Sequence, residues 1–184
     1  MPAASTAVAH RAHAPSTTVV LAGTLAGTLD GLFALSLQFA YTGAIAPVRL
    51  FQGIAYGALG DEAFAGGAAT ALLGLALHFG FAYAWAGVYF AAHRWLPPMR
   101  SITRTRAGAA AAGAGFGTLV WLVMNAVVKP IGGIPPTPVA SGMFAIMLAG
   151  HIAVVGWPIA AVVRATARRL GAASGDAGPG GAPE

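Results

Sequence analysis

The sequence predicts an all-α integral membrane protein, a bundle of four membrane-spanning helices. Only 8% of the 184 residues are charged and 57% are hydrophobic, whereas a soluble domain carries about 25% charged residues. So few charges cannot cover a globule of this size, which leaves the bilayer as its solvent. Four apolar stretches also reach the length of about 20 residues that a helix needs to cross the hydrocarbon layer.

The elements follow from the apolar runs and the polar stretches between them. A membrane domain of residues 17–169 is expected to hold spans at residues 18–41, 67–92, 107–128 and 139–163. Residues 47–60 are too few to span, and their apolar side chains recur at helical spacing. They predict a short amphipathic helix at the interface between spans one and two. Residues 1–16 and 170–184 are expected to be disordered cytoplasmic tails.

The first span carries one acid, Asp30, near its middle. A charge at the centre of a span costs about 2.5–3.5 kcal/mol on insertion scales, so Asp30 is expected to face protein or water. Gly23, Gly27 and Gly31 form a small-residue ladder that lets another helix approach closely. A cleaved signal peptide is the alternative, but this apolar run is longer than the usual signal sequence and contains Asp30.

The other spans each carry a polar residue: His78 in the second, Asn125 near the end of the third and His151 in the middle of the fourth. Asn125 is expected to make an interhelical hydrogen bond. Pro158 has no N–H to donate to the preceding turn, so a kink is expected close to His151. Asp61 is expected to cap the start of the second span.

An internal duplication is one interpretation of the chain. The sequence Gly-Thr-Leu occurs at 27–29 and again at 117–119, in matching places of the first and third spans. The two histidines lie in matching places of the second and fourth spans. Two tandem helical hairpins would give this pattern and would place a site between the halves. Gly113 and Gly117 form a second small-residue ladder in the third span.

The basic residues predict the orientation. With four spans, eight of the ten Lys and Arg residues fall on the side that holds both termini and the second loop. Positive residues mark the cytoplasmic side, so both termini are expected in the cytoplasm of a bacterial cell with the protein in its inner membrane. The same placement explains an isoelectric point of about 10.5 without a nucleic-acid partner.

Asp30, His78 and His151 are expected at one depth. At 1.5 Å per residue each lies roughly 17–18 Å from an end of its span, which is close to the bilayer centre. Ionisable residues there are functional candidates, and histidine carries protons near neutral pH. A proton relay, a structural polar cluster, bis-histidine haem ligation and a metal site of two histidines and one carboxylate are the competing interpretations.

Several features resemble a family of small bacterial inner-membrane proteins, broadly YagU-like. They are the segments GTLAGTLDGLFA, LFQGIAYGALGDEAFAGGAATALLGLALHF, NAVVKP and HIAVVGWPIA, within residues 18–163. Asp30, His78, Asn125 and His151 match the positions of the family's motif. The resemblance implies four membrane helices and names no substrate.

The sequence favours a small protein for proton-linked transport or permeation through the midplane Asp/His cluster. The alternative is a structural or accessory membrane protein whose buried polar residues only fix helix packing. No hydrolase, P-loop or dinucleotide motif is present, so no enzymatic activity, cofactor or metal is expected. The expected partners are the lipid bilayer and a proton or small solute, and a homo-oligomer is open because one four-helix bundle encloses only a narrow pore.

Overall fold

The computed structural model describes residues 3–175, with side chains from residue 16 to residue 169. Every regular element in residues 3–175 is helical, which confirms the all-α fold class. In chain order the elements are α1 (Ala3–Thr42), α2 (Pro47–Leu59), η1 (Gly60–Phe64), α3 (Gly67–Trp95), α4 (Pro97–Ile102), α5 (Arg106–Val123), η2 (Met124–Val128), α6 (Lys129–Ile131), α7 (Gly142–Gly150), η3 (His151–Gly156) and α8 (Trp157–Gly175).

Four of the helical segments are long and apolar enough to cross a membrane, as the sequence predicts. They contain between 26 and 29 residues and comprise Ser16–Thr42, Gly67–Trp95, Arg106–Ile131 and Gly142–Arg169. The third joins α5, η2 and α6, and the fourth joins α7, η3 and α8. The chain is therefore a multi-pass membrane protein.

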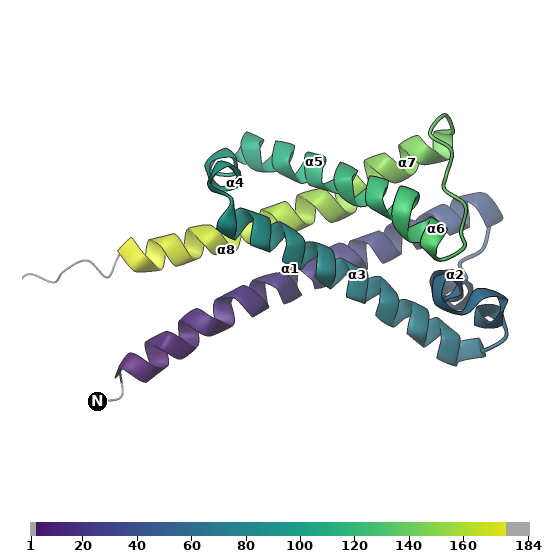
Figure 1. The fold of residues 1–184 in the computed structure, drawn as a ribbon, viewed down its shortest axis with the longest axis horizontal. Helices are drawn as coiled ribbons and strands as arrows, with labels where there is room; N and C mark the ends of the chain where they lie inside the picture. The colour runs from purple at the N-terminus through teal and green to yellow at the C-terminus, as the bar shows by residue number, and fades with distance from the viewer. Residues whose placement is uncertain (1–2, 176–184) are drawn as a thin grey trace, which may run out of the picture.

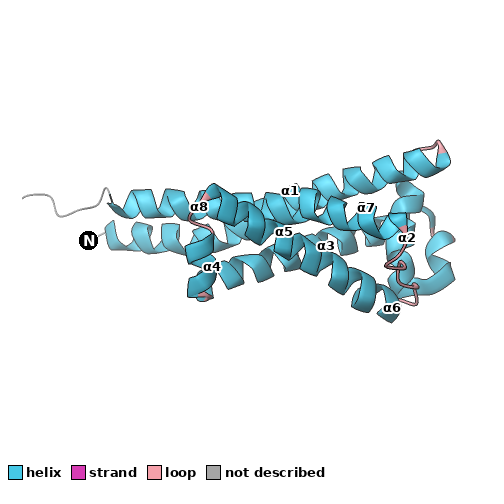
Figure 2. Cartoon of the chain, turned by 90° about the horizontal axis from the view of Figure 1, so that it is seen from above, coloured by secondary structure: helices cyan, strands magenta, loops and turns pink. Residues whose placement is uncertain are grey.

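The first two spans form one hairpin and the last two form another, and the hairpins meet where α1 contacts α8 (Figures 1 and 2). The α1 helix contacts α3 and α8, while α5 contacts η3 and α8. The start of α1, the α4 turn and the end of α8 lie at one end of the molecule, and α2 and α6 lie at the other (Figure 1). Successive spans therefore alternate in direction.

Buried glycines bring the paired helices close together. All five glycines of the two predicted ladders are buried. A Cβ atom at Gly27 would lie 2.9 Å from the Phe79 ring on α3, and one at Gly117 would lie 2.6 Å from the His151 carbonyl oxygen. These distances leave no room for a side chain, so glycine is required for both helix contacts.

The same contacts bear on the internal duplication. Gly27 and Gly117 begin two of the three Gly-Thr-Leu segments of the chain, the third being residues 23–25. Each of the two packs against the helix that carries a histidine. The carbonyl oxygen of Gly27 meets the His78 ring, and Gly117 faces the backbone of His151. In each hairpin the glycine therefore contacts the histidine of the paired helix, through the ring of His78 in the first and through the backbone of His151 in the second, and the duplication stays a prediction.

Two π-helical segments interrupt the third and fourth spans. Each ends two residues before a proline, η2 before Pro130 and η3 before Pro158. The N–H of Trp157 donates to the carbonyl of Ile152, five residues back, instead of four. The disruption expected close to His151 is thus a widened helical turn that begins at that residue, and such turns are frequent at functional sites.

Three expectations about the segments outside the spans require correction. The α1 helix begins at Ala3, so the disorder expected for residues 1–16 does not hold over residues 3–16, where several alanines favour helix. The α8 helix continues to Gly175, and the rest of the expected C-terminal tail lies outside the described residues. Asp61 lies within η1 and caps no helix, because α3 begins at Gly67 after Gly66.

The α2 helix ends at Leu59, close to the predicted boundary. It was expected to lie at the membrane interface, and it also packs against a span. It packs along the first half of α3. Its Gln52 is 5% exposed, and Nε2 of that residue donates to the Gly67 carbonyl over 3.1 Å. The amide therefore joins the middle of α2 to the first residue of α3 and fixes the position of α2 beside the spans.

The apolar core occupies the half of the bundle toward α4. Tyr89 of α3 and Phe116 of α5 pack edge to face with their ring centroids 4.9 Å apart. Ile159 and Val163 of α8 are buried against them. Toward α2 and α6 this core ends, and a cavity takes its place.

Candidate functional site in the central cavity

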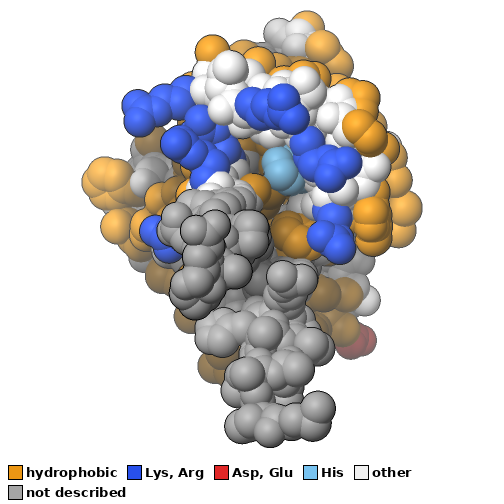
Figure 3. Space-filling view, turned by 90° about the vertical axis from the view of Figure 1, so that its left-hand side faces the viewer, with side chains coloured by type: hydrophobic (Ala, Val, Ile, Leu, Met, Phe, Trp, Pro, Cys, Tyr) orange, Lys and Arg blue, Asp and Glu red, His pale blue; other side chains and the backbone are white. Residues whose placement is uncertain are grey.

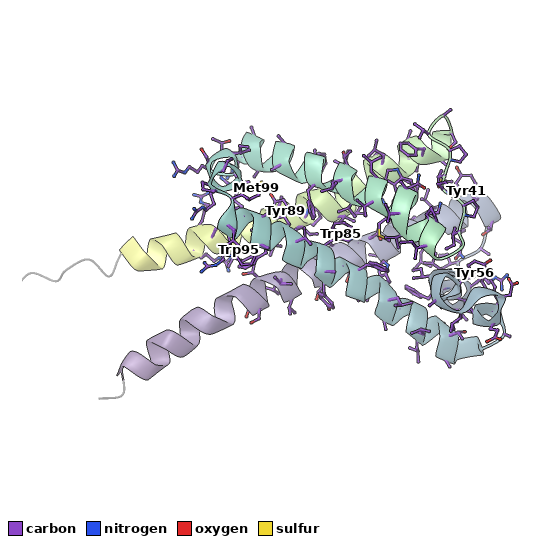
Figure 4. All side chains as sticks on the ribbon, viewed as in Figure 1. Tyr41, Tyr56, Trp85, Tyr89, Trp95 and Met99 are labelled. Carbon is purple, nitrogen blue, oxygen red and sulfur yellow. The ribbon has the colours of Figure 1, made fainter. Side chains whose placement is uncertain are left out.

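The cavity has a volume of about 500 Å³ and receives residues from all four spans and from α2. Asp30, His78 and His151 all line it, as does Lys129. Three of the four polar residues singled out from the sequence therefore share one cavity. Figure 4 shows Trp85, another lining residue, pointing from α3 toward α5 beside the core residue Tyr89.

His78 links α3 to α1 through both of its ring nitrogens. Nε2 donates to the carbonyl oxygen of Gly27 over 2.8 Å, and Nδ1 lies 3.9 Å from Oδ2 of Asp30. A carbonyl oxygen only accepts, so Nε2 must carry hydrogen. Nδ1 is the nitrogen that faces the carboxylate. The two side chains are 10% and 24% exposed, which places this pair at the cavity wall.

His151 is held within its own helix. Nδ1 donates to the carbonyl oxygen of Met147 over 2.8 Å, and the ring packs against Trp121 with centroids 5.0 Å apart. The residue is 7% exposed. Since Nδ1 is engaged with the backbone, Nε2 is the nitrogen that can bind another group.

Asn125 does not line the cavity and does not make the expected interhelical bond. Its Oδ1 accepts from the backbone N–H of Thr137 over 2.7 Å, and its Nδ2 donates to the Thr137 carbonyl over 3.1 Å. Thr137 lies in the loop between the third and fourth spans. Asn125 therefore fixes that loop, and the interhelical interpretation is wrong.

Lys129 was not predicted as part of the site. Its Nζ donates to Oγ1 of Thr137 over 2.9 Å and to Oδ1 of Asn125 over 3.4 Å, and the residue lines the cavity. The sequence placed it in a loop, where a lysine is an ordinary surface residue. In the structure the third span continues through η2 into α6, and this continuation places Lys129 at the cavity wall.

Two tryptophans of the cavity wall have unsatisfied polar atoms. The Nε1 atoms of Trp85 and Trp121 are buried without a hydrogen-bond partner. An indole N–H is a donor only, and an unmet buried donor costs about 1–3 kcal/mol. Nothing in the spacing of these tryptophans along the sequence indicates an unpaired N–H.

The site shows no metal-binding arrangement within residues 16–169, since no three His, Asp or Glu side chains there gather as metal ligands. No family model, curated protein or solved structure matches the chain. The resemblance to YagU-like proteins accordingly stays a prediction, and the function is argued from the cavity.

Proposed function

We propose that this protein moves protons, alone or with a small solute, across a bacterial inner membrane. The observation that carries the proposal is the opening of Asp30, His78 and His151 onto one cavity among four membrane spans. Ionisable residues inside a membrane are costly, and they mark ion and proton pathways when they face a cavity. No enzymatic step is part of the proposal.

The Asp30–His78 pair supplies the proton-binding unit. With Nε2 donating to Gly27, the pair carries no net charge when imidazolium faces carboxylate across 3.9 Å. Loss of the Nδ1 proton makes the pair negative, and protonation of the carboxylate makes it positive. The pair therefore takes up and releases a proton without breaking its bond to α1.

The distribution of charge supports an orientation with both termini in the cytoplasm. Arginines gather at the end of the molecule that holds α4, the last turn of α3, the first turn of α5 and the middle of α8 (Figure 3). They are Arg94, Arg100, Arg104, Arg106, Arg164, Arg168 and Arg169. The opposite end holds Arg49 with Asp61 and Glu62. Because positive residues stay on the cytoplasmic side, we assign the α4 end to the cytoplasm.

Proton flux into proteoliposomes that contain a pH-sensitive dye tests the proposal. Wild type, Asp30→Asn and Asp61→Asn are reconstituted at equal, monodisperse amounts. Asp30→Asn removes the carboxylate at the cavity, so we expect its flux to fall to that of empty liposomes. Asp61→Asn makes the same chemical change at an exposed site in η1 and is expected to retain wild-type flux.

Equal flux from wild type and Asp30→Asn would remove Asp30 from the pathway. No wild-type flux above empty liposomes, either with or without added solutes, would overturn the proposal. A fall in both variants would indicate a reconstitution defect, and repetition at matched thermal stability separates that case from the loss of a proton site.

A structural or accessory role is the second candidate, and one observation favours it. Each histidine donates a ring N–H to a backbone carbonyl, His78 to Gly27 on α1 and His151 to Met147 on its own helix. Such bonds fix helix positions without any proton movement. Under this role Asp30→Asn lowers the thermal stability of the purified protein, and wild type gives no flux.

A further inference from the structure

We infer that the arginine-rich end of the molecule binds an anionic phospholipid through the phosphodiester of its headgroup. Lipid binding at this end goes beyond the proposed function and requires no proton movement. Three features support it: an unbalanced positive charge, one arginine whose guanidinium group is already held in place, and exposed apolar side chains at the same end.

The first feature is the charge of what we call the arginine surface. It comprises seven residues of α3, α4, α5, α8 and the turn between α4 and α5 (Figure 3): Arg94, Arg100, Arg104, Arg106, Arg164, Arg168 and Arg169. All but Arg164 are exposed, and the other six side chains have no hydrogen bond or ion pair within residues 16–169. The acids of that part of the chain are Asp30 in mid-span and Asp61 and Glu62 in η1, at the opposite end. The described residues therefore leave the charge unbalanced, which favours an anionic partner.

The second feature is Arg164, which α8 holds against the turn before α5. Its Nε donates to the Thr103 carbonyl over 3.0 Å, and its Nη2 donates to the Arg104 carbonyl over 3.1 Å. These bonds use two of the five N–H groups of the side chain, so three remain. Because the guanidinium group is already held, an anion that binds it orders little further side chain. Its planar arrangement of donors matches the oxygens of a phosphate group.

The third feature is apolar surface at the same end. The arginine surface lies where spans begin and end, which is the level of the lipid headgroups. Trp95 is 73% exposed there, and Leu96 and Ile102 are more than half exposed. Figure 4 shows Trp95 at this end of the molecule. Tryptophan is enriched at the boundary between lipid and water, so these side chains are placed to contact acyl chains.

An anionic phospholipid fits all three features. Its phosphate can meet the arginines while its acyl chains cover the apolar side chains, and clusters of four to eight basic residues beside a span attract such lipids. Phosphatidylcholine carries an ammonium group as well, which the arginines repel. A free phosphate or a nucleic acid would use the charge alone and leave Trp95 and its apolar neighbours uncovered.

Equilibrium binding to the purified full-length protein in nonionic detergent micelles tests the proposal. Radiolabelled phosphatidylglycerol is the probe, and micelles without protein are the blank. Unlabelled phosphatidylglycerol is expected to displace the probe at least tenfold better than phosphatidylcholine with the same acyl chains. It should also displace the probe at least tenfold better than glycerol 3-phosphate, which has the phosphate and no chains. Binding should weaken from 0.1 M to 1 M salt, because the Debye length falls from about 10 Å to about 3 Å.

A matched pair of variants locates the lipid. Arg104→Gln removes one exposed charge of the arginine surface and keeps the backbone carbonyl that Arg164 binds. We expect about fivefold weaker binding, which is the contribution of one arginine near an anionic membrane surface. Arg49→Gln removes the same charge at the opposite end, where Arg49 lies over the Phe64 ring. It is expected to bind the probe as wild type does.

Equal displacement by phosphatidylcholine and phosphatidylglycerol would overturn the proposal, and so would unchanged affinity in Arg104→Gln or an equal loss in Arg49→Gln. Displacement by glycerol 3-phosphate, or by a short duplex DNA, as effective as that by the lipid would replace the phospholipid with a free phosphate or a nucleic acid. The lipid comparison on wild type decides the matter even if a variant fails to fold. The assay uses no gradient, so lipid binding and proton flux succeed or fail separately.

Discussion

Asn125 joins the third span to the loop that follows it, because its side-chain amide pairs with both backbone groups of Thr137. Asn125→Ala leaves that N–H and C=O without their partner. We expect a loss of about 1–3 kcal/mol in the free energy of unfolding, seen as a lower melting temperature by circular dichroism in detergent.

Thr137→Ala is the control for this prediction. It keeps both backbone groups that Asn125 binds and removes only the hydroxyl that accepts from Lys129. The control should melt closer to wild type than Asn125→Ala does. If the two variants melted together, the loop would depend on Lys129 and not on the amide pairing.

At the residue scale, the sequence predicted which ionisable groups lie together but not how they bond. Helical rise along each span predicted one depth for Asp30, His78 and His151, and all three line one cavity. Whether a residue faces the cavity depends also on the rotation of each helix about its axis and on π-helical turns such as η2 and η3. That is why Lys129 was missed and Asn125 was assigned the wrong partner.

At the element scale, the contact between α5 and η3 depends on the absence of a side chain at Gly117. A Cβ atom there would lie 2.6 Å from the His151 carbonyl oxygen, so Gly117→Ala must push the two helices apart. We expect a clear fall in melting temperature and a changed environment for His151, visible in the NMR spectrum of histidine-labelled protein.

Gly115→Ala provides the matched control on the same helix. Gly115 is exposed, and a Cβ atom there would meet nothing within 4 Å. Because alanine favours helix over glycine by about 0.8–1.0 kcal/mol, this variant should melt at or above the wild-type temperature. A stable Gly117→Ala protein with unshifted histidine signals would show that the helices are not in close contact.

The elements themselves were largely predictable, because a long apolar run in a bilayer must form a helix to satisfy its own backbone hydrogen bonds. The predicted span of residues 67–92 became α3, Gly67–Trp95, and residues 47–60 became α2, Pro47–Leu59. Pro158 indicated a disruption of the fourth span but not its π-helical form. The π-helical form arises because the Trp157 N–H binds the carbonyl of Ile152, five residues back. Packing around the helix decides which carbonyl is bound, and the sequence alone does not specify that packing.

At the scale of the whole molecule, the cavity arises from how the spans are paired. The large rings of Tyr89 and Phe116 meet at the α4 end, while at the other end α2 packs beside α3 and contributes to the cavity wall. The number and direction of the spans follow from apolar length and charge. The space between them depends on side-chain volumes in three dimensions, which no linear pattern specifies.

The orientation of the whole molecule in the membrane gives the last prediction. The chain contains no cysteine, so a single introduced cysteine reports the side on which it lies. Asp61→Cys places a thiol in η1, at the end opposite α4, and Ser101→Cys places one in α4 itself; both positions are exposed. With the arginine-rich end in the cytoplasm, a membrane-impermeant maleimide should label Asp61→Cys in cells with intact inner membranes. Ser101→Cys should react only after that membrane is permeabilised, and wild type should not react at all. The opposite pattern would place the arginine-rich end outside and reverse the orientation assigned to the protein. Labelling of both variants before permeabilisation would contradict the alternation of the four spans.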